Sequence, residues 1–521
     1  MIRIANGTIV DGTGGPGFRG DLVIEGDRIA DVLPAEASAV AFSSDIETID
    51  ATGCLVTPGF VDSHAHSDAY LVLEPDAPSK IAQGITTEIN GQCGGSVAPR
   101  YGEARLSGDW AALLGERLTW RSLAEYRAAL EAAKPAVNTV QFVGHNTLRS
   151  SVVGYAGRAA TPDELKRMCR LLEESLDQGG YGLTTGLIYQ PGRYSTPDEV
   201  VALAKVAAAK GGYYATHMRS EGDRIIEAID EVLELVRATG VRAEISHLKT
   251  SGRANWPKID AVLDKVGGAV ARGELLGSDR YPFCAAGTDL DVVLPDWAQE
   301  GAAVGEMARL GDAAARARII AELDAEPRDW STVMIGGTWS PESRALSGKT
   351  VAEAVEQFKQ TKKRTVSPGE LVCSILEMDG CKTGAFFFSM CEENMRRILA
   401  QPWIVPGSDA SLRAPRGPLG ADHPHPRAYG TMPEFYRLTH DIARMTSVPA
   451  RRFGLKGRGE IRRGFFADLA VWDEAKFANI ATYDSPHRFP TGMRAVFVNG
   501  ILSYRDGEFT QRRAGRFLVR N

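Results

Sequence analysis

Two stretches of the chain repeat one pattern: residues 161–189 read TPDELKRMCRLLEESLDQGGYGLTTGLIY, and residues 196–218 read TPDEVVALAKVAAAKGGYYATHM. Each opens with a Thr that can cap a helix, a Pro at the first helical position and a Glu that completes a capping box. Each predicted helix ends at Gly-Gly-Tyr and is followed by a β-like run. This alternation, at a spacing of about 30–35 residues, is typical of parallel βα units.

Eight short apolar runs along the chain read as β-strands of this kind. They are residues 54–66, 84–94, 137–146, 182–189, 213–218, 242–248, 275–283 and 403–410. Eight βα units predict an α/β fold with a closed (β/α)8, TIM-like barrel. The gap between the last two runs is too long for a structureless loop. We therefore expect a subdomain inserted late in the barrel, around residues 288–350.

Both ends of the chain read as β-structure outside this alternation. Residues 2–33 alternate apolar and polar side chains, and the C-terminal stretch contains a strong hairpin turn at Asn499-Gly500. We predict that the two termini together build a small β-sandwich from residues 1–57 and 455–521. The barrel domain would then span residues 58–454.

The composition is that of an ordinary folded protein. The 521 residues are 44% apolar and 24% charged, with 60 Lys and Arg against 66 Asp and Glu, a net charge of −6. A mildly acidic chain without a basic cluster argues against nucleic acid as a partner. No apolar run reaches about 18 residues, so we expect no membrane span, and the N-terminus does not resemble a secretory signal. The seven scattered cysteines include no CxxC pair, which favours a reduced, cytoplasmic protein.

Polar side chains gather at the C-terminal ends of the predicted strands, the face where barrel enzymes keep their active sites. His64-Ala65-His66 ends the first strand, and residues i and i+2 point to the same side, so both imidazoles face inward. His217 and His247 end two successive strands. Imidazoles gathered on one rim predict a zinc site. The polar strand-end residues are His64, His66, Cys93, His145, His217, His247, Asp279 and Asp409.

Cys93 is the predicted anionic ligand of this site. It ends the second strand in the segment NGQCGGS, whose glycines allow the backbone to pack closely. A thiol beside Zn²⁺ loses its proton and supplies the negative charge that imidazoles lack. Many two-metal barrel hydrolases bridge their metals with a carboxylated Lys on the fourth strand, but residues 182–189 contain no Lys. Cys93 is therefore the obvious donor.

Asp409, in the segment VPGSDA, ends the eighth strand, and a carboxylate beside a metal site is the usual general base. Cations and aromatic residues follow or lie near the strand ends. Fixed cations in a cleft suit a carboxylate on the substrate, and Arg can bind it in a bidentate manner. These candidate substrate-binding residues are Tyr189, Lys249, Tyr281 and Arg427.

With these motifs in order, the sequence resembles the amidohydrolase superfamily and, within it, the N-acyl-D-amino-acid deacylase (D-aminoacylase) family. The resemblance covers nearly the whole chain. It rests on PGFVDSHAHSD, GITTEINGQCGGSVAP, THMRSEGDRIIEAIDE, ISHLKTSG and GPLGADHPHPRAYGT. It implies a zinc enzyme that hydrolyses the amide bond of N-acyl-D-amino acids to a carboxylate and a free D-amino acid.

The resemblance also implies roles for individual residues. One zinc would be held tightly by Cys93, His217 and His247. A second, weaker site would be formed by His64, His66 and Asp409, with Asp409 as the general acid and base. The substrate's α-carboxylate would be contacted by Tyr189, Lys249, Tyr281 and Arg427. Relatives tend to carry a Ser at this carboxylate where the present chain has Gly287, so either Thr288 substitutes for it or the substrate is bound differently.

Two alternatives stay open at this point. A related amidohydrolase that acts on a cyclic amide or a small dipeptide, like a hydantoinase or a dipeptidase, would use the same metals and base. A non-catalytic scaffold with this fold would act through its surface, although such proteins typically lose ligands. In both enzyme hypotheses the partner is a small-molecule substrate. The sequence is also compatible with a homo-oligomer.

Overall fold

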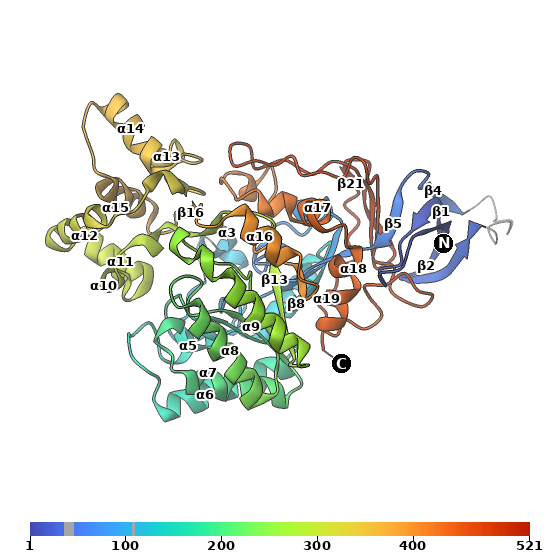
Figure 1. Ribbon diagram of the computed structural model, residues 1–521, viewed down its shortest axis with the longest axis horizontal. Coiled ribbons are helices and arrows are strands. Elements are labelled where there is room, and N and C mark those ends of the chain that lie inside the picture. The colour runs from blue at the N-terminus through green and yellow to red at the C-terminus, as the bar shows by residue number, and fades with distance from the viewer. Residues whose placement is uncertain (36–45, 107–109, 521) are drawn as a thin grey trace.

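The computed structural model describes residues 1–35, 46–106 and 110–520. Parallel strands lie near its centre, between a helical lobe on one side and a β-sheet on the other (Figure 1). Their hydrogen bonds, described below, arrange them in a ring. The strands of the ring are β6 (Phe60–Asp62), β7 (Ile85–Asn90), β8 (Asn138–Gln141), β9 (Val143–Gly144), β10 (Gly182–Gly186), β11 (Tyr213–His217), β12 (Arg242–Ile245), β13 (Leu276–Arg280) and β17 (Ile404–Pro406).

Each strand of the ring pairs in parallel with the next. β6 pairs with β7 and β7 with β8, and the order β9, β10, β11, β12, β13, β17 continues the circuit. β8 and β9 are two halves of one strand, interrupted at Phe142. The circuit closes where Ser63 N donates to Pro406 O at 3.1 Å and Asp409 N donates to His64 O at 2.8 Å. Within the described chain these contacts link the strands of the predicted barrel in one circuit.

Amphipathic helices such as α8 (Ile225–Thr239) cover the outside of the barrel with one apolar face. In α8, for example, Ile229, Val232 and Val236 are buried on that face. The α-helices outside the insertion are α1 (Tyr70–Leu73), α2 (Pro78–Ile81), α3 (Trp110–Leu114), α4 (Leu123–Ala133), α5 (His145–Val152), α6 (Pro162–Asp177), α7 (Pro197–Ala209), α8 (Ile225–Thr239), α9 (Ile259–Ala271), α16 (Glu392–Leu399), α17 (Arg427–Thr439), α18 (Ile442–Met445) and α19 (Ser447–Arg452). Short 3₁₀ turns are η2 (Gly115–Arg117), η3 (Gly192–Tyr194), η4 (Arg253–Lys258), η5 (Leu290–Val293), η6 (Trp330–Thr332) and η7 (Pro418–Gly420).

The two Thr-Pro-Asp-Glu segments start α6 and α7, but only the first forms the complete capping box. At α6, Thr161 Oγ1 accepts from Glu164 N at 3.3 Å, and Glu164 Oε2 accepts from Thr161 N at 2.7 Å. At α7 the Thr caps as expected, but the Glu199 carboxylate turns inward to His145 Nε2 at 2.8 Å. The prediction of a second capping box is wrong because a buried imidazole and the neighbouring Arg149 guanidinium bind that carboxylate.

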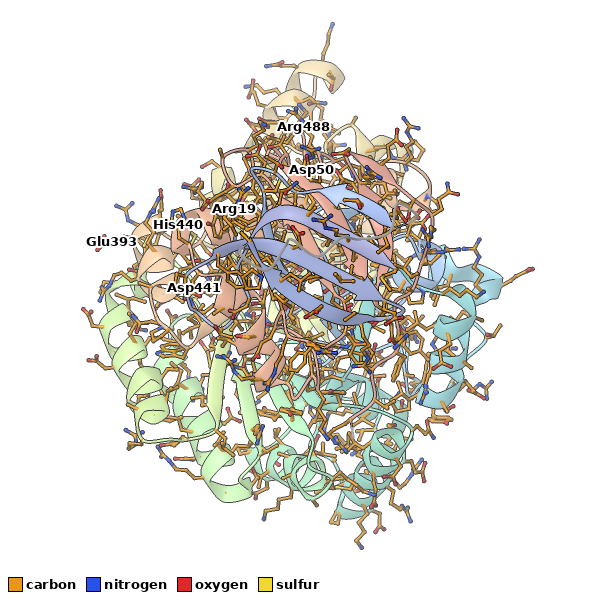
Figure 2. All side chains as sticks on the ribbon, turned by 90° about the vertical axis from the view of Figure 1, so that its right-hand side faces the viewer. Arg19, Asp50, Glu393, His440, Asp441 and Arg488 are labelled. Atoms are coloured by element: carbon orange, nitrogen blue, oxygen red, sulfur yellow. The ribbon has the colours of Figure 1, made fainter. Side chains whose placement is uncertain are left out.

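Strands from both termini form one sheet beside the barrel, seen face-on in Figure 2 with Arg19 and Asp50 labelled on it. Its order is β21-β20-β19-β18-β5-β1-β2-β3, with β4 paired to β1. The strands predicted to form a sandwich from the two ends thus belong to one continuous hydrogen-bonded sheet, because β5 pairs with β1 on one side and with β18 on the other. Its strands are β1 (Ile2–Ile9), β2 (Phe18–Glu25), β3 (Arg28–Pro34), β4 (Glu47–Asp50), β5 (Leu55–Pro58), β18 (Leu469–Trp472), β19 (Met493–Val498), β20 (Ile501–Arg505) and β21 (Glu508–Phe509).

The insertion late in the barrel is a lobe with its own hydrophobic core. The buried residues of this core run from Leu290 to Ala385, so they continue past the expected bound near 350 into two further helices. A small antiparallel sheet, in the order β14-β16-β15, connects the lobe to the barrel. The elements are β14 (Ala286–Asp289), α10 (Asp296–Gln299), α11 (Ala302–Gly311), α12 (Ala313–Ala325), β15 (Val333–Ile335), α13 (Pro341–Arg344), α14 (Val351–Lys362), α15 (Pro368–Asp379) and β16 (Gly384–Phe387).

Two general features complete the description of the chain. Among the described residues, none of the helices is both long enough and apolar enough to cross a membrane. The seven cysteines are all free thiols.

Candidate metal and active site

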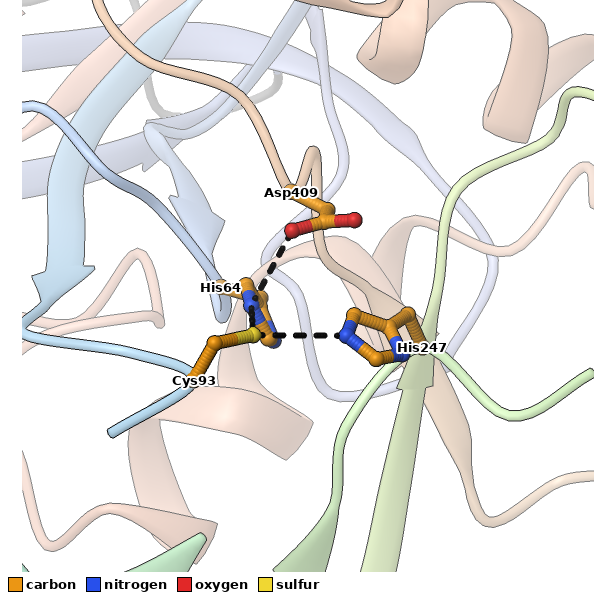
Figure 3. A group of neighbouring side chains, drawn as sticks. All are labelled: His64, Cys93, His247 and Asp409. Carbon is orange, nitrogen blue, oxygen red and sulfur yellow. Dashed lines mark hydrogen bonds and ion pairs between the residues drawn. The ribbon is translucent and has the colours of Figure 1, made fainter. Parts of the chain in front are cut away.

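Four side chains from the ends of four barrel strands converge on one point inside the barrel mouth (Figure 3). The Sγ of Cys93 lies 3.3 Å from Nε2 of His64 and 3.3 Å from Nε2 of His247. Oδ1 of Asp409 lies 3.3 Å from the same nitrogen of His64. All four potential ligand atoms lie within 4.8 Å of one another, a separation compatible with donors around one zinc ion.

Three of these four residues adopt left-handed backbone conformations. The φ angles are +52° at Cys93, +37° at His247 and +50° at Asp409. Non-glycine residues persist there only where the surrounding structure holds them, and they cluster at functional sites. Around Cys93 the chains approach so closely that a Cβ on Gly94 would lie 2.5 Å from the backbone nitrogen of Gly186. The glycines of the NGQCGG segment therefore allow the thiol to reach the rim.

His217 lies beside this group. Its ring centroid is 4.5 Å from that of His247, and the ligand atoms of His217, Glu221 and His247 lie within 4.8 Å of one another. Both ring nitrogens of His217 are buried, and Nε2 lies 3.5 Å from Oε2 of Glu221, beyond an ordinary hydrogen bond. A thiol with buried imidazoles beside it is the donor set that zinc prefers. The residues present therefore fit a zinc site.

Neighbouring charges in the site shift the pKa values of Cys93 and His66. Burial raises the pKa of the Cys93 thiol, but the imidazoles of His64 and His247 outweigh it and hold this pKa well below its ordinary value. Burial lowers the pKa of His66, but the hydrogen bond to Asp409 outweighs it and raises this pKa to about 9. Nε2 of His66 lies 3.1 Å from Oδ1 of Asp409. A thiolate at this position is ready to bind a metal cation.

Two carboxylates orient the imidazoles. Oδ2 of Asp279 lies 3.2 Å from Nδ1 of His64, and Oδ1 of Asp279 accepts from the backbone N of His247 at 2.9 Å. Oε1 of Glu221 lies 2.9 Å from Nδ1 of His247. In both pairs the carboxylate engages Nδ1 and leaves Nε2 directed at Cys93, which is how outer carboxylates commonly set the tautomer of a metal ligand.

Sequence reasoning did not assign these two carboxylates a role. Asp279 stands out only as one polar residue at a strand end, and Glu221 only as part of the THMRSEGDR motif. The available signal for Glu221 is its position four residues after His217. His145, also at a strand end, does not join the cluster, since its Nε2 bonds to Glu199.

The predicted substrate-binding residues surround the same point. The Tyr189 ring centroid lies 4.8 Å from that of His217, and Thr288 Oγ1 donates to the Tyr189 hydroxyl at 3.4 Å. The buried Tyr281 hydroxyl makes no hydrogen bond to a described residue. The guanidinium of Arg427 lies 4.7 Å from the centre of the Tyr281 ring. The structure thus brings these residues together with the ligand cluster.

The two predicted clamp cations already have carboxylate partners. Lys249 forms an ion pair with Glu221, and its Nζ lies 2.7 Å from Nδ1 of His247. Arg427 Nη1 donates to Asp409 Oδ2 at 2.8 Å, and its Nη2 donates to Gly287 O at 3.1 Å. Gly287, at the position of the expected Ser, therefore contributes a backbone oxygen to Arg427 and no side-chain hydroxyl.

Known proteins resemble this chain in sequence and in fold. A sequence model of the amidohydrolase family matches residues 47–504. The chain belongs to the amidohydrolase family. It is 34% identical, over 100% of its length and 97% of the relative's, to a D-aminoacylase of Alcaligenes xylosoxydans xylosoxydans. It is 33% identical to an N-acyl-D-glutamate deacylase of the same organism, over 99% of this chain and 96% of the relative.

Solved structures of amidohydrolases of this kind superpose on the whole chain. A crystal structure of a D-aminoacylase aligns with a TM-score of 0.82 and 32% identity, and it covers 100% of this chain and 99% of that one. An N-acyl-D-glutamate deacylase of Bordetella bronchiseptica, in complex with zinc and a phosphonate inhibitor, aligns with a TM-score of 0.82 and 30% identity at the same coverage. A D-hydantoinase of Thermus shares only the fold, at 16% identity and a TM-score of 0.56.

Proposed function

We propose that this amidohydrolase uses zinc to cleave the amide bond of N-acyl-D-amino acids, giving a carboxylate and a free D-amino acid. One observation carries the proposal: Asp409 lies between the imidazole of His64 and the buried guanidinium of Arg427. Its Oδ1 is 3.3 Å from Nε2 of His64, and its Oδ2 accepts from Arg427 at 2.8 Å. A general base would thus stand beside both the metal and a cation suited to the substrate's α-carboxylate.

The donors divide into two groups. Cys93, His217 and His247 would hold one zinc tightly, since a thiolate with imidazoles is a strong zinc-binding set. His64 and His66 with Asp409 would form a second, weaker site. A zinc ion held by these donors would act as a Lewis acid on the scissile carbonyl. The convergence of His64, Cys93, His247 and Asp409, with His217 beside His247, supports zinc binding here.

Asp409 would move the proton of the reaction. Its carboxylate takes a proton from the attacking water and returns it to the nitrogen of the leaving amine. Burial raises the pKa of Asp409, but Arg427 and His247 outweigh it and hold this pKa well below its ordinary value. The group is therefore ionised at neutral pH.

The substrate's α-carboxylate would be held beside the scissile amide by two cations and two phenols, with Thr288 near one of the phenols. With the carboxylate and the carbonyl both fixed, an exchange of substituents at Cα turns the side chain of an L-substrate into the wall of the site. The enzyme would therefore prefer D-substrates. The residues of this clamp are Tyr189, Lys249, Tyr281, Arg427 and Thr288.

Three coarser proposals accompany this function. We retain residues 58–454 as the catalytic barrel and residues 1–57 with 455–521 as the domain that both ends build. The free thiols support a cytoplasmic location. The substrate is a small molecule, and the proposed function is compatible with a homo-oligomer.

A substrate screen with parallel metal analysis tests the proposal. N-acetyl and N-formyl derivatives of D- and L-amino acids are assayed beside hydantoins and dipeptides. We expect turnover of the acyclic D-derivatives by protein that contains zinc. Turnover of hydantoins alone, or equal rates on both enantiomers, would contradict the proposed substrate class.

A further inference from the structure

Lys80 is a fully buried lysine that the proposed mechanism does not use. It lies in the short helix α2, and none of its side chain is exposed. Its Nζ lies 2.9 Å from a carboxylate oxygen of Asp62 and 2.9 Å from one of Glu88, both also fully buried. A buried ammonium is costly unless it is paired and hydrogen-bonded. These three charges therefore form one compact unit.

The ammonium of Lys80 also reaches the loop that carries Asp409. Nζ donates to Ser408 Oγ at 3.1 Å and to Ala410 O at 3.0 Å. Ser408 and Ala410 are the two neighbours of Asp409 in the chain. The contacts of Lys80 therefore hold the peptide on both sides of the proposed base.

Asp62 extends this connection to the loop that carries His64. Its Oδ1 accepts from the backbone N of Ser408 at 2.8 Å, and the same oxygen lies 3.3 Å from the backbone N of His64. Ser408 Oγ donates to Asp62 Oδ2 at 2.5 Å. The two strand-end loops that close the barrel are thus tied to one carboxylate, which forms an ion pair with Lys80.

The backbone of Asp409 needs such support. Its φ of +50° is left-handed, and a non-glycine residue stays there only where its surroundings determine the conformation. Asp409 N donates to His64 O at 2.8 Å, and Ala410 N donates to Ser408 Oγ at 3.2 Å. In this conformation the side chain of Asp409 is directed at the imidazoles and at Arg427.

We propose that Lys80 is a positioning residue, which holds Asp409 in its left-handed conformation and so aims the carboxylate at the ligand cluster. Its consequence for catalysis rests on the proposed function, in which Asp409 transfers the proton. Lys80 does not touch the substrate. It acts through Ser408, Ala410 and Asp62, at a site where a misplacement of about 1 Å costs about 10²-fold in rate.

The kinetic test combines two substitutions in the full-length, zinc-loaded protein. Lys80→Met should lower kcat by about 10²-fold and leave KM within about threefold, because the substrate-binding residues are untouched. In the Asp409→Asn background the same substitution should cost less than about threefold, since the group it positions is already gone. Equal losses in both backgrounds, or an unchanged kcat in the single variant, would overturn the proposal.

A buried ion pair away from the site supplies the matched control. Arg458 and Asp468 are both buried and form an ion pair, and Arg458 also donates to Asn499 at 2.8 Å. Arg458→Met removes a buried charge of similar cost and should lower thermal stability without the loss in kcat. A loss in kcat as large as that of Lys80→Met would show that the effect is one of general destabilisation.

A structural readout keeps the inference independent of the substrate. A crystal structure of Lys80→Met should show Asp409 outside the left-handed region, with its carboxylate displaced from His66 by more than about 0.5 Å, the tolerance of a catalytic constellation. An unmoved Asp409 would overturn the proposal. Ser408→Ala keeps all three charges and tests the same link where Lys80→Met does not fold. If the wild-type protein hydrolyses no N-acyl-D-amino acid, the proposed function fails, and this readout still decides the role of Lys80.

Discussion

Arg427 and Asp409 form a buried ion pair in which Nη1 of the guanidinium lies 2.8 Å from Oδ2 of the carboxylate. The pair joins the residue proposed to bind the substrate's α-carboxylate to the residue proposed to move the proton. An arriving carboxylate competes with Asp409 for the same cation, and a carboxylate that shares its cation becomes more basic. Substrate binding would therefore make Asp409 a stronger base at the moment when a base is needed.

Replacement of Arg427 should separate acids from amides. A charge-assisted contact in a partly dry cleft contributes about 1.5–3 kcal/mol, or roughly 10–150-fold. Arg427→Met should lower kcat/KM on N-acetyl-D-amino acids by at least that range. The matching α-amides lack the charge and should lose much less. Steady-state kinetics on paired acids and amides measures the difference.

Arg444 offers a matched control for that variant. It is another mostly buried arginine, whose Nε donates to Asp441 at 2.9 Å, and it lies in α18, outside the site. Arg444→Met should reduce stability without distinguishing acids from amides. A loss on Arg427→Met that is equally large for acids and amides would remove the carboxylate clamp and favour a cyclic-amide substrate.

Asp409→Asn should abolish most of the turnover and keep the tightly held metal. The change removes the proton-accepting oxygen but little volume, and general acid–base catalysis contributes about 10²–10⁴-fold. Zinc content, measured on the same preparation, should stay at about one ion per chain because the proposed tight site, Cys93 with His217 and His247, does not include Asp409. A variant within tenfold of the wild-type rate would show that another group is the base.

Cys93→Ala should strip the protein of its firmly held zinc. The substitution removes the one thiolate of the ligand cluster, and the loss of a direct ligand should weaken zinc binding by more than about tenfold, the lower end of the effect of losing an outer partner. Metal analysis after dialysis measures it. Cys169→Ala, a partly buried thiol on α6, is the control and should keep its zinc. Full zinc retention in Cys93→Ala would exclude Cys93 from the site.

The sequence predicted the positions of the ligands better than their orientation. The strand-end placement of His64, Cys93 and Asp409 follows from the βα alternation, because all parallel strands of a barrel end on one face. The barrel closure between the first and eighth strands follows from the same count. Which atoms meet across that face depends on barrel curvature and on backbone angles such as the φ of +50° at Asp409, and no local pattern encodes these.

The sequence did not predict the contacts that support the ligand residues. Asp279 and Glu221 orient two imidazoles, and Lys80 pairs with two buried carboxylates, yet each reads in the sequence as an ordinary charged residue. Their partners are distant in the chain, so only the folded barrel brings them together. The lobe was placed correctly late in the barrel, but its core extends to Ala385 because its later helices pack on the earlier ones.

The two Thr-Pro-Asp-Glu segments show how tertiary contacts override a local motif, and they lead to a prediction about acid stability. Glu164 remains at the surface of α6, where Arg158 binds its carboxylate in a bidentate manner at 2.7 and 2.8 Å. That guanidinium, together with the backbone N–H of Thr161, lowers the pKa of Glu164 to about 2. Glu199, in the equivalent place, is instead committed to a buried pair with Arg149.

Glu164→Gln should therefore reduce the sensitivity of the protein to acid. The pKa of Glu164 is lower in the folded state than in the unfolded chain, so between about pH 4.5 and pH 2 the unfolded state binds more protons. The stability that this carboxylate contributes is complete above that window and is lost as the pH falls through it. For a group this close to solvent we expect about 1 kcal/mol. Urea midpoints at pH 7, 5 and 3, followed by circular dichroism, should fall less steeply with decreasing pH in the variant than in the wild type.

Thr161→Ala is the control for this prediction. It removes an uncharged cap worth about 1 kcal/mol and should lower the urea midpoint at every pH. An acid limb of unchanged slope in Glu164→Gln would show that this ion pair contributes nothing to the pH dependence.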